Sequence, residues 1–575
     1  MRLQPIYDIA EICARHGISQ AIVCPGSRCA PLTLAFARHE KISCRTLSDE
    51  RSAGFVALGI AQQTKTPAVL VSTSGSAAYN FSPAVAEAFF QQIPVLIFTA
   101  DRPKEWIDQL DGQTIRQENL FGNHVKKSYT LPADYTHADA IWYIHRTVNE
   151  AIALAQEFPQ GPVHINIPLR EPLYPAAGEK ISFTKNIRIT QAAGGKIVLS
   201  EKELKPLLTE LTGYQKVMLV AGQNDYHEGL LKAVEKFIKI HKVALLGDVI
   251  SNFHSLSTNI PLAEIFLGQC SESVAQSLQP DLLITFGKSV ISKNLKVFLR
   301  KNPSLHHWHI QPGGLSSDTF QALTRIIYAE PKLFFESLST PPHLDKFELQ
   351  KKDNYANLWK AEMHRAQLAS LAFFSKSGFN ELTGIREIIN ALPERCNLHL
   401  ANSMAVRYAN LIGLAEKGNG VRVFSNRGTS GIDGCTSTAV GHALSSDVPN
   451  ILITGDLAFF YDRNAFWHNY PIPNLHVVVV NNHGGVIFNL IDGPGDLPEA
   501  NEFFITRQRL SARHLAHEFG FQFQEADNLK QLKSSFKDFF KFDGPTRILE
   551  ITTDQASSKE SFNQFKNHIK SSYES

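Results

Sequence analysis

Short runs of apolar residues recur along the whole chain, and most of them end in Gly, Ser, Asn or Asp. Runs bounded by such turn-forming residues are typical of buried strands in a parallel sheet. In the first third of the chain they occupy residues 21–27, 68–75, 94–103 and 162–168. Between the last two runs, apolar residues recur at the spacing of an amphipathic helix, at positions 141, 144, 148, 152 and 155. Strands that alternate with helices predict right-handed βαβ units and a doubly wound sheet.

This alternation breaks at two places. Residues 170–183 are punctuated by Pro and Gly, and residues 337–354 carry two adjacent prolines followed by a charged run. After the first break, strand-like runs resume at residues 216–225, 242–251, 281–289 and 306–314. After the second, they resume at residues 398–403, 421–428, 450–460, 476–485 and 547–554. We therefore predict an α/β protein of three doubly wound domains with mainly parallel sheets, at residues 1–182, 183–345 and 346–575.

Composition and charge exclude several other classes of protein. The 575 residues include 57 Lys and Arg against 55 Asp and Glu, and the net charge of +2 argues against a general nucleic-acid binder. The seven cysteines form no C-x-x-C pair, so we expect neither a disulfide framework nor a zinc site. The first segment of the chain is amphipathic and mixed in charge, so we do not expect it to be a signal peptide. Its longest apolar runs are far shorter than the roughly 20 residues that cross a bilayer. We expect a soluble, cytoplasmic protein without a membrane span.

Two short motifs, Gly-Asp and Asn-Asn, lie at the ends of predicted strands in the last domain. Asp456 follows Gly455, and Asn482 follows Asn481, with a separation (482 − 456 = 26) that suits one βαβ unit. The two side chains should then lie at the carboxyl edge of the sheet, where open α/β folds bind ligands. A carboxylate and an amide oxygen are ligands for Mg²⁺ or Mn²⁺, and these cations leave positions for phosphate oxygens. Either pair alone would more simply be a turn after a strand, but the paired spacing favours a metal site.

A second candidate lies in the first domain. Glu50 follows Asp49 and precedes a helix of small residues. An acidic residue at a helix start can simply complement the helix dipole, and it can also serve in acid–base catalysis. Taken alone, such a residue more often only complements the helix dipole.

The order of the loop motifs carries a resemblance to a known family. These motifs are CPGSR (24–28), DERSAGF (49–55), TSGSAA (73–78), TADRP (99–103), GQTI (112–115), SNRGTSGIDG (425–434), GDL (455–457) and NNHGG (481–485). Neither a P-loop nor a G-x-G-x-x-G motif occurs. The chain resembles the thiamine diphosphate enzymes, and within them the branch that joins 2-oxoglutarate to isochorismate in menaquinone biosynthesis. Leu457 stands where Gly is common in the wider family, a departure that this narrower branch shares.

The resemblance implies a cofactor and the residues that hold it. Thiamine diphosphate would bind through Mg²⁺ or Mn²⁺, and the metal ligands would be Asp456, Asn482 and the carbonyl group of Gly484. Glu50 would be the catalytic residue and would hydrogen-bond the aminopyrimidine ring of the cofactor. Ile432 would be the apolar wedge that keeps the cofactor bent. The other cofactor contacts would be Ser430, Gly431, Leu457, Ala458 and Ile487.

The resemblance also implies a set of substrate contacts. Both substrates carry carboxylates, and bidentate guanidinium pairing is the usual way to recognise them. The arginines in question are Arg28, Arg102, Arg407 and Arg427. Further contacts would come from Ser27, Gln113, Lys293, Ser403 and Phe488. Each arginine could instead be a surface charge or part of a local salt bridge. The Ser430–Gly434 segment could be an ordinary Gly-rich loop, and Ile487 and Phe488 could be core residues.

In the middle domain the resemblance is weaker. Lys293 matches a lysine of the family, but Asn294 stands at a position where a member of that family has arginine. His306, His307 and His309 alternate within an apolar run, which indicates ordinary strand residues rather than metal ligands.

The resemblance implies a transferase that is a homodimer or homotetramer with its active sites at the subunit interface. Two alternatives use the same cofactor: a 2-oxoacid decarboxylase, or an acetohydroxyacid synthase that would bind a flavin in its middle domain. A third alternative is a regulatory protein that kept the fold and lost catalysis. The presence of Glu50, Asp456 and Asn482 argues against that third alternative.

Overall fold

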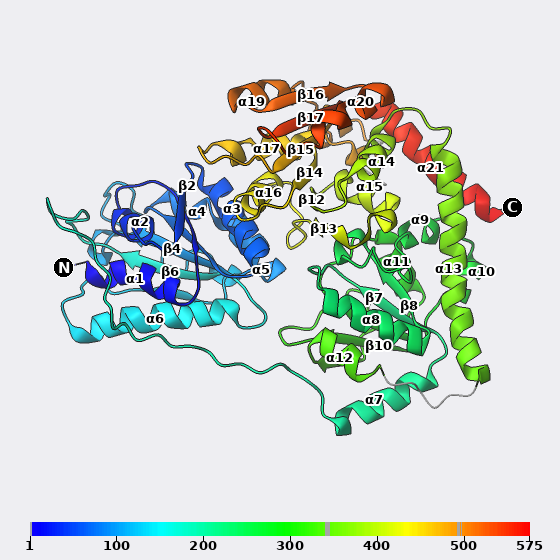
Figure 1. Cartoon of the computed structure of the whole chain (residues 1–575), viewed down its shortest axis with the longest axis horizontal. Helices are drawn as coiled ribbons and strands as arrows, with labels where there is room; N and C mark the ends of the chain where they lie inside the picture. The colour runs from blue at the N-terminus through cyan, green and yellow to red at the C-terminus, as the bar shows by residue number, and fades with distance from the viewer. Residues whose placement is uncertain (1–2, 340–345, 491–494, 496, 575) are drawn as a thin grey trace. The chain divides into compact units, whose positions relative to one another are not determined.

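The computed structural model describes residues 3–339, 346–490, 495 and 497–574. The described residues form three sheets, whose strands pair in parallel and are connected by helices (Figure 1). The predicted fold class, α/β with three doubly wound sheets, is thereby confirmed. In the same described residues, no helix combines the length and the apolar character that crossing a membrane would require.

The first sheet has the strand order β2-β1-β3-β4-β6-β5. Its strands are β1 (Gln20–Val23), β2 (Ser43–Thr46), β3 (Ala68–Ser72), β4 (Val95–Asp101), β5 (Ser128–Thr130) and β6 (Val163–Pro168). Its helices are α1 (Gln4–Arg15), α2 (Ala30–Ala37), α3 (Glu50–Thr64), α4 (Ser76–Tyr79), α5 (Ser82–Gln91) and α6 (Ala138–Gln156). The four predicted strands correspond to β1, β3, β4 and β6, and the predicted amphipathic helix is α6.

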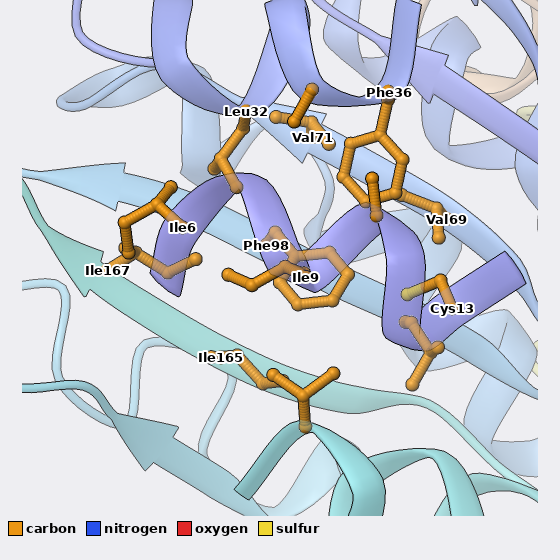
Figure 2. Packing of buried hydrophobic residues seen from close by; sticks show 14 of the residues in the cluster. Ile6, Ile9, Cys13, Leu32, Phe36, Val69, Val71, Phe98, Ile165 and Ile167 are labelled. Atoms are coloured by element: carbon orange, nitrogen blue, oxygen red, sulfur yellow. The ribbon is translucent and has the colours of Figure 1, made fainter. Parts of the chain in front are cut away.

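The core of this first sheet explains its sequence pattern. Strands β3 and β4 are buried along their whole length, so they read as continuous apolar runs. Figure 2 shows how α1 and α2 cover one face of the sheet, with Ile9 and Phe36 pointing toward Phe98. Because Ile6, Ile9 and Cys13 share one side of α1, that helix buries an apolar stripe against the strands.

The second sheet has the strand order β11-β10-β9-β7-β8. Its strands are β7 (Val217–Ala221), β8 (Ala244–Gly247), β9 (Leu282–Phe286), β10 (His306–Gln311) and β11 (Arg325–Tyr328). Its helices are α7 (Glu201–Gly213), α8 (Glu228–His241), α9 (Ala263–Leu267), α10 (Glu272–Ser277), α11 (Lys293–Lys301) and α12 (Pro331–Ser337). All of the strands except β11 were predicted.

The histidines of β10 are strand residues. The Thr285 hydroxyl on β9 lies 2.8 Å from His307 Nε2 and 2.7 Å from His309 Nδ1. Burial lowers the pKa of both imidazoles, to about 4 for His307, so both stay neutral near pH 7. Within the described part of the chain, no group of three His, Cys, Asp or Glu side chains is placed to hold a metal.

The third sheet has the strand order β13-β12-β14-β15-β17-β16. Its strands are β12 (Cys396–Leu400), β13 (Val421–Phe424), β14 (Asn450–Gly455), β15 (Leu475–Asn481), β16 (Gln522–Ala526) and β17 (Arg547–Thr552). The helices before β14 are α13 (Lys346–Phe374), α14 (Glu381–Ala391), α15 (Met404–Ile412) and α16 (Cys435–Ala443). The helices after it are α17 (Asp456–Tyr461), the 3₁₀ turn η5 (Arg463–Phe466), α18 (Ile487–Leu490), α19 (Ala512–Glu518), α20 (Leu529–Phe539) and α21 (Gln555–Glu574).

The described residues group into two compact units. The first unit comprises Met1–Gly194, Asn426–Asn450 and Ala458–Leu475. The second comprises Gly195–Ser425, Ile451–Leu457 and His476–Ser575. Helices α3 and α16 therefore belong to the same unit although they are far apart in sequence.

Within the first unit, α3 and α16 approach each other closely because of two glycines. A Cβ atom on Gly59 would lie 2.2 Å from the carbonyl oxygen of Thr438, and one on Gly441 would lie 2.2 Å from that of Val56. Neither position has room for a larger residue. Helix α16 is fixed further by Asp462, whose carboxylate accepts hydrogen bonds of 2.7 Å from both the backbone N–H and the hydroxyl of Ser437 on α16.

Candidate active site

The second unit carries the predicted metal ligands, which lie at the carboxyl edge of the third sheet. Strands β14 and β15 are neighbours, as the spacing of the two motifs predicted. Asp456 begins α17 directly after β14, and Asn482 follows β15. Both side chains are buried, with exposed fractions of 2% and 7%. Gly484 packs so closely that a Cβ atom there would lie 2.9 Å from the carbonyl oxygen of Ile505.

The chemistry of these groups fits a divalent cation. The side-chain nitrogen of Asn482 donates to Glu381, and within the described residues the buried Oδ1 of Asn482 has no hydrogen-bond partner. Burial raises the pKa of Asp456, although a hydrogen bond of 2.6 Å from Gln508 Nε2 partly compensates. A buried carboxylate and an unpaired amide oxygen are costly unless a cation binds them. The residues present therefore fit Mg²⁺ or Mn²⁺.

Glu381 orients the amide of Asn482, and sequence reasoning missed it. This buried glutamate is the first residue of α14, and it accepts hydrogen bonds from Asn482 Nδ2 and, at 3.0 Å, from the Tyr408 hydroxyl. Burial raises the pKa of Glu381 to about 7. By fixing the nitrogen of the Asn482 amide, Glu381 leaves the amide oxygen as the group available to a cation.

Gln508 is the second residue that sequence reasoning missed. Its Nε2 donates to Asp456 Oδ2 and, at 3.1 Å, to Asn481 Oδ1. A cavity of about 710 Å³ lies beside these groups, lined by Asn482, His483, Arg507, Gln508, Arg509, Thr553, Asp554, Gln555 and Ala556. Its two arginines suit anionic groups such as phosphate or carboxylate.

Glu50 lies in the first unit, at the start of α3. Asp49 caps the helix by accepting from the N–H groups of Arg51 (2.9 Å) and Ser52 (3.3 Å). The other oxygen of Asp49 accepts a hydrogen bond of 2.7 Å from Asn464 Nδ2. Glu50 itself is half-buried and accepts a hydrogen bond of 3.3 Å from Asn80 Nδ2. Asp49 thus fixes the helix start next to Glu50 through hydrogen bonds to the helix backbone and to Asn464.

Three of the motif loops in the first unit follow the carboxyl ends of β1, β3 and β4. Arg102 donates at 3.0 Å to the carbonyl oxygen of Gly112, so the loop after β4 is joined to the segment that carries Gln113. Ser27 and Gln113 are exposed. Arg28 is buried and donates a hydrogen bond of 2.9 Å to the carbonyl oxygen of Leu169. Part of its guanidinium group is therefore already hydrogen-bonded within the protein.

The loop between β13 and α16 carries the next group of predicted contacts. Arg427, Ser430 and Gly431 are half-buried, and Ile432 is 37% exposed. Exposure of this isoleucine suits a side chain that packs against a bound ligand. Ser430 adopts a left-handed backbone conformation (φ 63°), which marks a tight turn next to these residues.

The remaining substrate contacts predicted in the second unit are more scattered. Arg407 is half-buried and donates at 2.5 Å to the carbonyl oxygen of Ser403, which has a left-handed φ of 71°. Lys293 is exposed at the start of α11. Asn294 binds Glu264 through its backbone N–H (2.9 Å to Oε2) and its side chain (2.8 Å to the carbonyl oxygen). Asn294 therefore has a structural contact of its own.

The last predicted contacts lie in short helices next to the metal ligands. Leu457 is half-buried and Ala458 is buried, both directly after Asp456. Ile487 and Phe488 begin α18 and are half-buried, and the ring centroid of Phe488 lies 5.9 Å from that of Phe504. Glu50 and the arginine loops 28, 102 and 427 thus belong to the first unit, and the metal ligands, Ser403 and Arg407 belong to the second.

Comparison with known proteins defines the class. A family model described as "Thiamine pyrophosphate enzyme, N-terminal TPP binding domain" matches residues 7–124. The chain is an enzyme of the class that uses thiamine diphosphate with a divalent cation, as the loop motifs predicted.

The similarity to individual proteins is more specific and covers nearly the whole chain. The 2-succinyl-5-enolpyruvyl-6-hydroxy-3-cyclohexene-1-carboxylate synthase of Cytophaga hutchinsonii is 43% identical over 572 residues, which is 99% of this chain and 100% of that protein. The enzymes of the same name from Flavobacterium johnsoniae and Bacteroides fragilis are 39% and 36% identical, over 95% and 98% of this chain and 95% and 99% of their own lengths. The chain belongs to the 2-succinyl-5-enolpyruvyl-6-hydroxy-3-cyclohexene-1-carboxylate synthase family.

Proposed function

We propose that this enzyme catalyses the reaction for which its relatives are named. It decarboxylates 2-oxoglutarate on thiamine diphosphate and transfers the four-carbon unit to isochorismate by conjugate addition. The products are 2-succinyl-5-enolpyruvyl-6-hydroxy-3-cyclohexene-1-carboxylate and CO₂, and the step belongs to menaquinone biosynthesis. The observation that carries the proposal is the 43% identity over 99% of the chain, with the cofactor motifs intact.

The chain's own residues have distinct roles in holding the cofactor. Asp456, Asn482 and the carbonyl group of Gly484 would bind the cation, and the cation would bind the diphosphate. Glu50 would hold a proton at the aminopyrimidine ring, the role for which its fixed helix start is suited. The bound cofactor supplies the electron sink that loss of CO₂ requires. The remaining cofactor contacts would be Ser430, Gly431, Ile432, Leu457, Ala458 and Ile487.

The two substrates bring several carboxylates to one site, and the positive charge of the proposed arginines complements their negative charge. Guanidinium–carboxylate pairing orients each substrate and limits the geometries in which they meet. The arginines proposed for this role are Arg28, Arg102, Arg407 and Arg427. Ser27, Gln113, Lys293 and Ser403 would add polar contacts, and Phe488 would close the apolar side.

We also propose the organisation of the chain around this site. Domain boundaries at 1–182, 183–345 and 346–575 are supported by the gaps between β6 and β7 and between β11 and β12. A homodimer or homotetramer with interfacial active sites is supported by the resemblance to thiamine diphosphate enzymes. A cytoplasmic location is supported by the seven cysteines, which are all free thiols in the described chain.

The reaction is tested by measuring CO₂ release from 2-oxoglutarate with thiamine diphosphate and Mg²⁺, with and without isochorismate. We expect release that depends on isochorismate and is accompanied by loss of its absorbance. Turnover of pyruvate in place of 2-oxoglutarate would keep the cofactor chemistry and overturn the substrates. A flavin in the purified protein would favour an acetohydroxyacid synthase instead.

A further inference from the structure

A buried carboxylate outside the residues discussed above holds the loop that carries Arg427. Glu87 lies on α5 with an exposed fraction of 1%. Its Oε1 accepts hydrogen bonds from the backbone N–H of Gly428 (2.8 Å) and from Gln91 Nε2 (2.6 Å). Its Oε2 accepts from the backbone N–H (2.6 Å) and the hydroxyl (2.5 Å) of Thr429. These four donors match the acceptor capacity of an ionised carboxylate.

The loop also touches the backbone of α5. A Cβ atom on Gly428 would lie 2.8 Å from the carbonyl oxygen of Glu87 and 3.1 Å from the backbone nitrogen of Gln91. Only glycine fits this approach. Charge-assisted hydrogen bonds and close packing therefore fix the same two residues, directly between Arg427 and Ser430.

The helix that supplies Glu87 is packed tightly against α3, the helix that begins with Glu50. Both helices belong to the first unit. A Cβ atom on Gly54 of α3 would lie 2.7 Å from the Cβ atom of Ala84 on α5. Glu87 thus connects the loop of Arg427 to a closely packed pair of helices.

We propose that Glu87 is a positioning residue, which fixes the 427–432 loop so that Arg427 meets a substrate carboxylate. This inference rests on the proposed function, which assigns Arg427 to substrate binding. Glu87 is buried and both of its carboxylate oxygens accept hydrogen bonds from the loop, so it acts through Arg427 and does not touch the substrate. A displacement of about 1 Å in a substrate-orienting group can cost roughly 100-fold in rate.

The test compares Glu87→Gln with a matched control, Asp8→Asn. Glutamine keeps the size of Glu87 but places an NH₂ group against loop donors. Asp8 is equally buried and accepts from the N–H (2.9 Å) and the hydroxyl (2.8 Å) of Thr184, a segment without a proposed contact to substrate. We expect both variants to lower the melting temperature. Only Glu87→Gln should raise KM for one substrate, by roughly 10- to 100-fold.

A double-mutant cycle with Arg427→Ala separates this inference from the proposed function. If Glu87 acts through Arg427, Glu87→Gln raises KM for the same substrate as Arg427→Ala does, and the double variant is no worse than Arg427→Ala. Wild-type KM in Arg427→Ala would overturn the assignment of Arg427. A raised KM in Arg427→Ala with wild-type kinetics in Glu87→Gln, or additive effects in the double variant, would overturn the role of Glu87.

A milder variant keeps the test decisive if Glu87→Gln fails to fold. Thr429→Val removes one hydrogen bond to Glu87 from the exposed side of the loop and leaves the other three donors in place. It should raise KM for the same substrate by a smaller factor, of roughly threefold to tenfold. Unchanged kinetics in Thr429→Val would then contradict the inference.

Discussion

At the scale of single residues, Glu381 controls which atom of Asn482 faces the proposed cation. Replacing Glu381 by Ala removes the acceptor for the amide nitrogen, so the amide is free to turn its NH₂ group toward the cation. We expect the affinity for Mg²⁺, measured by titrating Mg²⁺ into the enzyme in the presence of thiamine diphosphate, to fall roughly 10- to 100-fold. Glu381→Gln keeps an oxygen acceptor and serves as the control. Unchanged affinity in Glu381→Ala would mean that other contacts orient Asn482.

A second residue-scale prediction concerns Asp462. Burial raises the pKa of this carboxyl from 3.8 to about 7. The folded state therefore binds more protons than the unfolded state between about pH 4 and pH 7, and stability falls as the pH rises through that window. Asp462→Asn keeps an oxygen acceptor for the Ser437 N–H and removes the titration.

The measurement is the difference in melting temperature between the wild type and Asp462→Asn across this pH range. The wild type should lose stability relative to the variant as the pH rises from about 4 to about 7, and the difference should level off above that range. A difference that does not change with pH would show that Asp462 is not protonated in this window in the folded protein.

Some residues of the candidate metal site were predictable from the sequence and others were not. Asp456 and Asn482 were predictable because the spacing of two strands determines where their ends lie. Glu381 and Gln508 contact these residues from separate parts of the chain. No local pattern marks either residue, so only the three-dimensional fold identifies them.

At the scale of elements, the contact between α3 and α16 depends on glycines, which have no side chain to separate the helices. Gly441→Ala places a methyl group where the Val56 carbonyl oxygen lies 2.2 Å away, so the helices must separate. This overpacking outweighs the gain of about 1 kcal/mol in helix propensity. We expect a melting temperature lower by roughly 2 to 10 °C. Gly213→Ala in α7, where nothing lies within 4 Å, is the control and should leave the melting temperature near that of the wild type.

A melting temperature of Gly441→Ala equal to that of Gly213→Ala would contradict the close approach of α3 and α16.

The strands differ in how well the sequence predicts them. Central strands such as β4 are buried throughout and were predicted, whereas edge strands such as β11 and β16 carry exposed polar residues and were missed. The close contact between α3 and α16 was equally invisible in the sequence, because its glycines have no periodic pattern.

At the scale of the whole molecule, the residues proposed to act on the cofactor are divided between the two compact units. Glu50 belongs to the first unit and the metal ligands belong to the second. The resemblance to thiamine diphosphate enzymes implies that such parts meet across a subunit interface. We therefore expect activity per chain to fall on dilution, in step with dissociation measured by sedimentation velocity. A fully active monomer would contradict this expectation.

We propose that Glu50 performs the proton chemistry while a separate cation site binds the cofactor. The most direct measurement is made on Glu50→Gln, in which calorimetry gives thiamine diphosphate affinity with Mg²⁺ and a second assay gives CO₂ release from 2-oxoglutarate. We predict cofactor affinity close to that of the wild type and turnover lowered by roughly 100- to 10,000-fold. Wild-type turnover in Glu50→Gln would contradict this role of Glu50.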